Sequence, residues 1–255
     1  LDASPQLLRK INYRTRIRRV IKYASSIIIV SPHMIDTLKL DRYKKKVHLV
    51  PCSVDPAEFT TERAAADDHK PVRILHSGRL TSKKGVPDLI SVCIELNKIY
   101  PDIEVDIVGE GNDLKLCREL IAESDATNIH LHGVQPQSEV RRFMSEADIF
   151  ALNSRVGDSG DMEGTPVSIQ EAMSMKLAVV STYHAGIPLL ITNEENGLLV
   201  EERDNEALKS ALIRLINDPA MRTRLGTAAR KTIEEKFTVE SMNRKIFEVY
   251  KDSLK

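Results

Sequence analysis

The sequence has little of what builds metal centres, disulfide frameworks or membrane spans. Its 255 residues include three cysteines, Cys52, Cys93 and Cys117, which show neither a Cys-x-x-Cys pair nor the spacing of a zinc site. No apolar run approaches the ~20 residues of a membrane-spanning helix, and no signal peptide is visible. We therefore expect buried or half-buried thiols, a reducing compartment and a cytoplasmic protein.

A dinucleotide-binding fingerprint is also incomplete. Gly109 and Gly111 follow a predicted strand, but the third glycine of the fingerprint would fall at position 114, which is Leu114. This argues against NAD or FAD and disfavours a dehydrogenase, so we expect no cofactor. The two glycines then mark a tight turn, and Gly109 is a candidate for contact with a ligand.

Charge balances over the whole chain but not along it. The 37 Lys and Arg match the 37 Asp and Glu, yet residues 1–52 hold 12 Lys and Arg against three Asp, a net charge of +9. Residues 53–255 therefore carry −9. A basic segment suits an anionic partner, such as a membrane surface or a phosphorylated acceptor, or else forms a solvated helix face. We expect no nucleic-acid partner.

The sequence of residues 1–52 indicates only part of a domain. They contain an amphipathic helix at 5–24, a β-branched strand at 26–31, a helix at 32–40 and a strand at 46–51. Two strands cannot bury both faces of a parallel sheet, so we expect the C-terminal part of a larger N-terminal domain. The chain begins with Leu1 rather than Met, which favours a fragment or a processed form. Residues 53–71 lack an apolar period and are predicted to be a linker.

Residues 72–236 alternate regularly between predicted strands and helices. This alternation predicts an α/β domain with a Rossmann-like, doubly wound parallel sheet and its ligand at the carboxyl ends of the strands. The helix in residues 237–255 is expected to pack back on the N-terminal part. Strands are predicted at 72–76, 105–108, 129–131, 149–152, 178–181 and 198–200, and helices at 86–100, 114–124, 138–145, 166–176, 205–217, 219–236 and 239–254.

Two glutamates, Glu163 and Glu171, lie on either side of a predicted helix start. Thr165 fits the N-cap and Pro166 fits the first helical position, so the loop 157–164 leads to a helix N-terminus, which favours anions. Carboxylates around such an anion site suit a ligand that carries both a diphosphate and hydroxyl groups. A sugar nucleotide has this chemistry.

A glycine and two cations follow the first strand of the same domain. Gly78 allows the backbone to approach a ligand closely, while Arg79 and Lys84 offer N–H donors and positive charge to a diphosphate. His76, at the end of that strand, more simply has a structural role. His184 either reaches the ligand or is a satisfied histidine after a strand.

The acidic loop before the predicted helix allows two interpretations. Asp158, Asp161 and Glu163 form either a cation site or a solvated acidic loop, and the second interpretation is favoured. The sequence contains no Asp-x-Asp triplet. We therefore predict no metal at this site.

The order of these motifs resembles the family-4 retaining glycosyltransferases of the two-Rossmann, or GT-B, fold. Gly78-Arg79-Leu80 with Lys84-Gly85 comes first, then Val-Gly-Glu-Gly at 108–111, then Glu163 and Glu171 with seven residues between them. Residues 26–32 and 50–59 resemble the end of that family's N-terminal domain and its hinge. Residues 160–168 and 181–188 are most similar to the colanic-acid and exopolysaccharide branch.

The resemblance implies a role for each matching residue. Arg79 and Lys84 would neutralise the donor diphosphate, Glu163 would face the donor sugar, and Glu171 would accept hydrogen bonds from two ribose hydroxyls. Glu163, Arg79 and Lys84 are thus the predicted catalytic residues. The predicted donor-binding set is Gly78, Arg79, Lys84, Gly109, Gly133, Val134, Glu163, Gly164, Thr165, Pro166, Val167 and Glu171, with Gly133 and Val134 beside the base.

The implied activity is metal-independent transfer of a hexose, with retention, from a nucleotide-diphospho-sugar to a polysaccharide or lipid-linked glycan acceptor. The family usually has an acidic residue where this chain has Leu189, and its N-terminal domain normally supplies the acceptor site. The alternatives are a nucleotide-sugar epimerase of similar fold and a non-catalytic nucleotide-sugar-binding fragment. The basic N-terminal helix would place the protein peripherally at the inner face of the plasma membrane.

Overall fold

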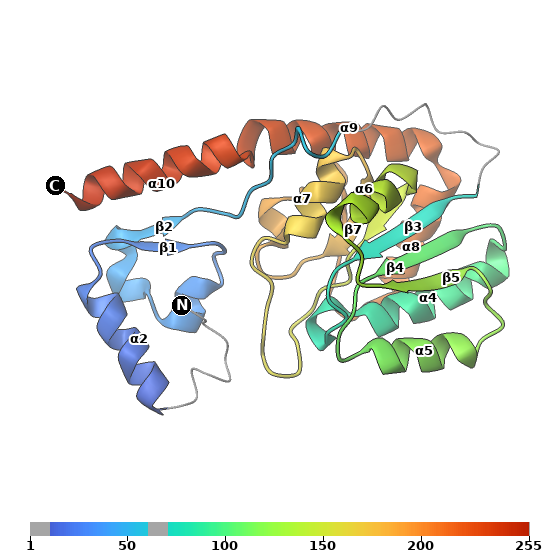
Figure 1. Cartoon of the computed structure of the whole chain (residues 1–255), viewed down its shortest axis with the longest axis horizontal. Helices are drawn as coiled ribbons and strands as arrows, with labels where there is room; N and C mark the ends of the chain where they lie inside the picture. The colour runs from blue at the N-terminus through green and yellow to red at the C-terminus, as the bar shows by residue number, and fades with distance from the viewer. Residues whose placement is uncertain (1–10, 61–70, 255) are drawn as a thin grey trace.

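The computed structural model describes residues 11–60 and 71–254 and contains two parallel sheets. A small N-terminal unit holds a two-stranded sheet, and a larger domain holds a six-stranded sheet with helices on both faces. Figure 1 shows the small unit beside the domain, with the last helix extending from the domain across the small unit. The α/β class predicted from the alternation of strands and helices is confirmed.

The N-terminal unit packs one amphipathic helix and one short helix against its two strands. Ile17 and Ile21 of the first helix are buried with Ile29 of the sheet and Leu40. Lys46 closes this unit, because its ammonium donates to the carbonyl of Ile21 at 2.6 Å near the C-terminal end of the helix. The elements are α2 (Ile11–Tyr23), β1 (Ile27–Ile29), α3 (Met34–Leu38), the 3₁₀ helix η1 (Asp41–Lys46) and β2 (Val47–Leu49); residues 5–10 of the predicted first helix lie outside the described residues.

The six strands of the larger sheet are all parallel and lie in the order β5-β4-β3-β6-β7-β8. The strand order therefore reverses beside β3, and this switch point is where doubly wound sheets bind ligands at their carboxyl ends. The strands are β3 (Arg73–Ser77), β4 (Glu104–Val108), β5 (Ile129–Gly133), β6 (Ile149–Ala151), β7 (Ala178–Thr182) and β8 (Leu198–Val200).

Two apolar cores form, one on each face of this sheet. Ile74 packs with α4 and α8 on one face, while its neighbour Leu75 packs with α6 and α7 on the other, as the two-residue period of a strand requires. The helices are α4 (Val86–Ile99), α5 (Leu114–Ala122), α6 (Gln137–Glu146), α7 (Val167–Ser174), α8 (Asn205–Asn217), α9 (Pro219–Lys236) and α10 (Val239–Ser253), with 3₁₀ helices η2 (Ser82–Lys84) and η3 (Ile187–Leu189).

The first residues of the predicted linker are anchored to the larger domain. Val54 and Phe59 are buried in the same core as Phe237, and Val54 forms an isolated parallel bridge with Thr238. Residues 61–70 of that segment lie outside the described residues. At the far end of α10, the hydroxyl of Ser253 lies 2.8 Å from that of Ser26, which joins the last helix to the N-terminal unit.

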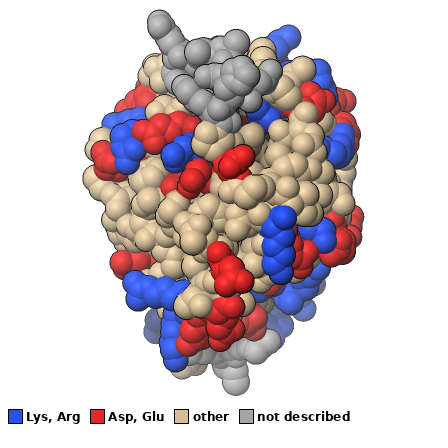
Figure 2. All heavy atoms as spheres, turned by 90° about the vertical axis from the view of Figure 1, so that its right-hand side faces the viewer, with Lys and Arg blue, Asp and Glu red and all other residues tan. Residues whose placement is uncertain are grey.

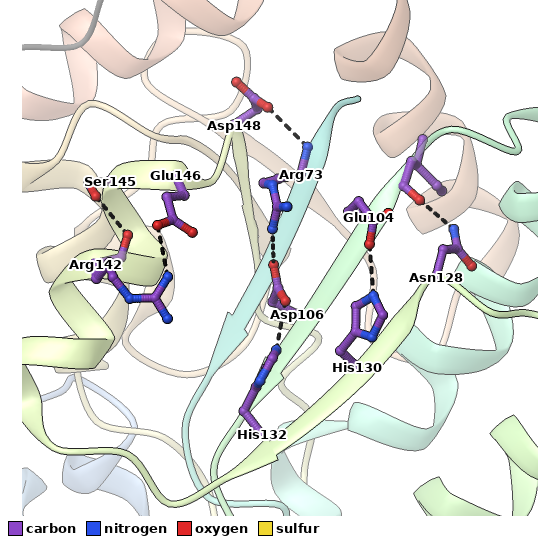
Figure 3. Close-up of polar contacts among 11 residues, drawn as sticks. Arg73, Glu104, Asp106, Asn128, His130, His132, Arg142, Ser145, Glu146 and Asp148 are labelled. Atoms are coloured by element: carbon purple, nitrogen blue, oxygen red, sulfur yellow. Dashed lines mark hydrogen bonds and ion pairs between the residues drawn. The ribbon is translucent and has the colours of Figure 1, made fainter. Parts of the chain in front are cut away.

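A polar ladder crosses three neighbouring strands of the large sheet (Figure 3). The carboxylate of Asp106 on β4 contacts two side chains. Its Oδ2 lies 3.2 Å from the guanidinium of Arg73 on β3, and its Oδ1 lies 2.7 Å from Nε2 of His132 on β5. Two residues along the same strands, His130 lies 2.8 Å from Glu104. Asp106 is buried, so its two partners satisfy a carboxylate that would otherwise be costly to remove from water.

One face of the larger domain is mixed in charge. Figure 2 shows the face on the right of Figure 1, where Lys and Arg side chains alternate with Asp and Glu and neither sign forms a continuous patch. The net positive charge found in the sequence lies instead in residues 1–52, which belong to the N-terminal part. In the described ranges, every helix is too short or too polar to serve as a membrane span.

Candidate functional site

Glycines bring the carboxyl ends of three strands together at the switch point. The backbone N–H of Gly78 donates to Val108 at 3.0 Å, and that of Gly109 donates to Gly133 at 2.8 Å. Gly109 has φ +135°, and a Cβ there would lie 1.9 Å from the carbonyl oxygen of Gly78. A side chain at this position would therefore clash with backbone, so the turn after β4 requires glycine.

A buried ion pair lies beside these strand ends. The Lys84 ammonium lies 3.1 Å from Oε1 of Glu163, and the two residues are 9% and 6% exposed. Lys84 ends η2, and Gly85 then turns the chain with φ +59° into α4. The two side chains come from segments about 80 residues apart, so the sheet topology is what brings a predicted cation and a predicted carboxylate into contact.

His184 fixes the backbone that carries Glu163. The N–H of Glu163 donates to Nε2 of His184 at 3.0 Å, so Nε2 holds a lone pair and the imidazole proton lies on Nδ1. That Nδ1–H donates to the Glu202 carboxylate at 2.6 Å, and Glu202 also accepts from the Val156 N–H at 2.9 Å. His184 is therefore a satisfied histidine that positions Glu163, the second of the two roles considered for it.

The helix after the acidic loop begins later than the sequence predicts. Helix α7 starts at Val167, and Pro166 occupies the N-cap with ψ 122°, outside the helical region. The prediction of Thr165 as N-cap and Pro166 as first helical residue is therefore wrong. The Thr165 hydroxyl instead accepts a hydrogen bond from the Cys52 N–H at 3.0 Å, a contact from the N-terminal unit that local sequence does not reveal.

The N-terminal unit closes directly over this loop. A Cβ on Gly164 would lie 3.0 Å from Val30, and one on Gly186 would lie 2.8 Å from the Ser31 hydroxyl and 2.0 Å from the Gly164 carbonyl. Burial, and then the neighbouring His184, lowers the pKa of His33 in the same turn. Both glycines therefore allow close packing of the two parts of the protein.

Glu171 lies half-buried on α7 and accepts a hydrogen bond from Nε2 of Gln137 at 3.1 Å. Burial raises the pKa of its carboxyl, against the opposing effects of Gln137 and Arg141. Arg79 is exposed, as is Val134, which is 70% exposed on the turn after β5. These predicted residues are therefore accessible to solvent, whereas Lys84 and Glu163 are enclosed.

Two acidic residues of the loop, Asp161 and Glu163, form ion pairs with lysines. Asp161 pairs with Lys83 at 2.9 Å, and the Asp158 N–H donates to the Ser82 hydroxyl at 3.1 Å. Among the described residues, no group of three or more His, Cys, Asp or Glu side chains is placed to hold a metal ion. The paired acidic residues of this loop can therefore orient the backbone of Glu163.

Comparison with known proteins identifies the family. The family model described as "Glycosyl transferases group 1" matches residues 58–232, which include the strand-end glycines, the Lys84–Glu163 pair and Glu171. The chain belongs to the glycosyl transferases group 1 family. The motifs of the sequence had indicated a glycosyltransferase of this kind, and that part of the prediction is confirmed.

Relatives of this group 1 chain include proteins of polysaccharide assembly. The amylovoran biosynthesis glycosyltransferase AmsK of Erwinia amylovora is 36% identical over 80% of the chain and 50% of AmsK. A Salmonella typhimurium protein named for colanic acid biosynthesis, WcaL, is 33% identical over 79% of the chain and 50% of WcaL. The chain thus spans about half the length of the curated relatives it matches.

The solved structures share the fold of the group 1 chain. HepE from Anabaena, crystallised with UDP, has a TM-score of 0.84 at 18% identity and covers 97% of this chain and 69% of HepE. At that identity the likeness establishes the fold alone, which is the GT-B class.

The group 1 fold assembles some of the predicted residues more tightly than others. The backbone N–H of Gly78 donates to Val108 and that of Gly109 donates to Gly133, and Lys84 contacts Glu163. Sequence reasoning missed Glu202, because its link to Glu163 runs through His184 across three separate loops. No local pattern near Glu202 signals that role.

Proposed function

We propose that this domain binds a nucleotide-diphospho-sugar at the switch point of its large sheet, and that the protein transfers a hexose from it to a polysaccharide or lipid-linked glycan. The buried Lys84–Glu163 pair beside the strand-end glycines is the observation that carries the proposal. The names of AmsK and WcaL support a role in exopolysaccharide assembly, and the UDP bound by HepE supports a nucleotide donor.

The proposed chemistry uses the cations for the leaving group. Lys84 and Arg79 bind the diphosphate and stabilise the charge that develops on it as the glycosidic bond to phosphate breaks. Glu163, released from Lys84 by the competing phosphate, then accepts hydrogen bonds from the sugar hydroxyls. The leaving phosphate takes the proton of the attacking acceptor hydroxyl, which gives retention without a metal or another cofactor.

The remaining predicted residues hold the nucleoside. Ionised Glu171 accepts hydrogen bonds from both ribose hydroxyls, a geometry that suits a carboxylate with two oxygens. Val134 offers an apolar surface to the base on the exposed turn after β5. Gly164 and the residues up to Val167 bring backbone close to the sugar and phosphate oxygens.

The first experiment measures donor affinity by calorimetry with UDP-, GDP- and ADP-sugars. Arg79→Ala and Glu171→Ala should each weaken binding of the preferred donor by about 1–3 kcal/mol, the scale of a lost charge-assisted hydrogen bond. Glu119→Ala, on the outer helix α5, is the control and should leave affinity unchanged. Unchanged affinity in both site variants would refute the proposed site.

Product analysis separates the proposal from its alternatives. An epimerase converts the nucleotide sugar without an acceptor, so a new sugar nucleotide formed from donor alone would favour that activity. A non-catalytic binding fragment would bind donor but neither hydrolyse nor transfer it. Transfer of labelled sugar to an acceptor glycan by the chain would exclude both.

We also propose that the N-terminal unit contacts an anionic membrane surface at the inner face of the plasma membrane. A cavity of about 850 Å³ lies between α2, α3 and η1. Its walls carry six cations and no acidic residue, which supports attraction of lipid phosphate groups. The cationic residues that line the cavity are Arg14, Arg18, Arg19, Lys22, Lys39 and Arg42.

A further inference from the structure

His76 contains a buried nitrogen that lacks a hydrogen-bond partner. The side chain is fully buried in β3, and its Nδ1 lies 3.1 Å from the carbonyl oxygen of Ala151. Because a carbonyl only accepts, Nδ1 carries the proton and Nε2 holds a lone pair. Nε2 is enclosed and has no partner among the described residues. Buried polar atoms are normally paired, so this one calls for an explanation.

Lys84 borders the same space as this lone pair. A Cβ built on Gly78 would lie 3.6 Å from Nε2 of His76 and 4.0 Å from the Lys84 ammonium, so both atoms border the space that glycine leaves free. The ammonium has three N–H donors, and its ion-pair partner is a single carboxylate oxygen, Oε1 of Glu163. An unused acceptor and unused donors therefore lie around one point.

We propose that His76 is a positioning residue for Lys84: its Nε2 accepts a hydrogen bond from the ammonium once Lys84 leaves Glu163. The inference rests on the proposed function, in which the donor diphosphate draws Lys84 away from Glu163. An ammonium released from a buried carboxylate still needs acceptors, since water has little access there. The imidazole supplies one on the side away from the ligand.

A neutral imidazole suits this role better than a second carboxylate would. It holds the ammonium in place without neutralising its charge, so the full positive charge remains for the diphosphate. Burial, and then Lys84, lowers the pKa of His76 to about 4, so the ring is uncharged at physiological pH. Because Nε2 is enclosed, His76 acts through Lys84 and does not itself touch the ligand.

Two substitutions separate the acceptor from the rest of the ring. His76→Gln places an amide oxygen near the position of Nε2, whereas His76→Asn keeps a donor near Nδ1 for Ala151 and removes the acceptor. Calorimetry with UDP, GDP and ADP should show about fivefold to tenfold weaker binding of the preferred nucleotide by His76→Asn and less than about twofold by His76→Gln. In a Lys84→Met background the two variants should bind alike.

A second measurement does not depend on any ligand. In protein labelled with ¹⁵N-histidine, the Nε2 resonance of His76 should shift in Glu163→Gln, because Lys84 then lacks its carboxylate partner and turns to the imidazole. An unmoved resonance, or a His76→Asn variant that binds as tightly as wild type, would overturn the inference. If wild type binds none of the three nucleotides but the resonance shifts, the donor proposal fails while the His76–Lys84 link stands.

Discussion

At the scale of single residues, burial determines which side chains can react. Burial raises the pKa of Cys93 to about 12, and burial together with Asp113 raises that of Cys117 to about 11, so both remain thiols. All three cysteines are free, with Cys52 half-buried, as their spacing had predicted. The same burial keeps His76 neutral. Burial therefore keeps both of these thiols and this imidazole uncharged at physiological pH.

His76 should make the protein less stable in acid. Its pKa falls from 6.5 to about 4 on folding, so below pH 6.5 the unfolded chain binds a proton that the native protein does not. Stability is therefore lost as the pH falls through this window, by on the order of 3 kcal/mol in total. The free energy of unfolding, measured with urea across this pH window, should depend less on pH in His76→Gln than in wild type. The control variant, His48→Gln on β2, should behave like wild type. Parallel profiles would contradict this assignment.

Residue roles were predictable only where a local motif carries them. The motifs around Gly78, Lys84 and Glu163 follow predicted strands, and the structure places all three at the carboxyl ends of the large sheet, with Lys84 in contact with Glu163. Thr165 was misassigned because its partner, the Cys52 N–H, is 113 positions away. The roles of His184 and Glu202 depend on contacts that form only after folding.

At the scale of elements, the turn after β4 is tightly constrained by its backbone neighbours. Gly109 combines a positive φ with a backbone neighbour 1.9 Å from where a Cβ would be. Gly133 on the next strand also has a positive φ, of +66°, but a Cβ there would meet only the flexible Glu110 side chain at 3.5 Å. Gly109 therefore combines backbone strain with a steric clash, whereas Gly133 has the strain alone.

Replacing each glycine by alanine should therefore have different costs. Gly133→Ala should lower the free energy of unfolding by about 1–2 kcal/mol, the cost of a left-handed conformation. Gly109→Ala adds the clash with Gly78 and should lower it by more than about 3 kcal/mol. Urea denaturation monitored by circular dichroism measures both, and equal losses would contradict the role assigned to the close approach.

The strands and helices themselves were largely predictable. All six strands of the large sheet were predicted to within a few residues, because buried parallel strands have β-branched and apolar runs that end in turn residues. The 3₁₀ helices η1, η2 and η3 were missed, since such short elements have no apolar period. The start of α7 was wrong by one residue because Pro166 is extended in ψ.

At the scale of the whole molecule, charge separates the two parts of the protein. Residues 1–52 carry +9, and the remainder carries the opposite charge. The cavity between α2, α3 and η1 gathers part of the positive charge, whereas the far face of the domain is mixed in sign (Figure 2). An anionic surface should therefore approach the N-terminal unit first.

Removing part of this charge should weaken membrane contact. Each basic residue near an anionic bilayer contributes about 1 kcal/mol, so loss of four should reduce sedimentation with phosphatidylglycerol vesicles at least about tenfold. Vesicles of phosphatidylcholine alone should bind little of either protein. Undiminished binding rejects the proposed contact. The variant replaces Arg14, Arg16, Arg18 and Arg19 by Gln, and its control replaces Lys98, Lys115 and Arg118 on α4 and α5.

The hydrogen bond between Ser26 and Ser253 has a consequence for biosynthesis. The two residues are 227 positions apart, and the ribosome adds about 5–20 residues per second, so roughly 10–45 s separate their synthesis. During that interval the small sheet has no contact with α10, the helix that Figure 1 shows reaching across to it. The contact between Ser26 and Ser253 can therefore form only after the whole of the large domain has been synthesised.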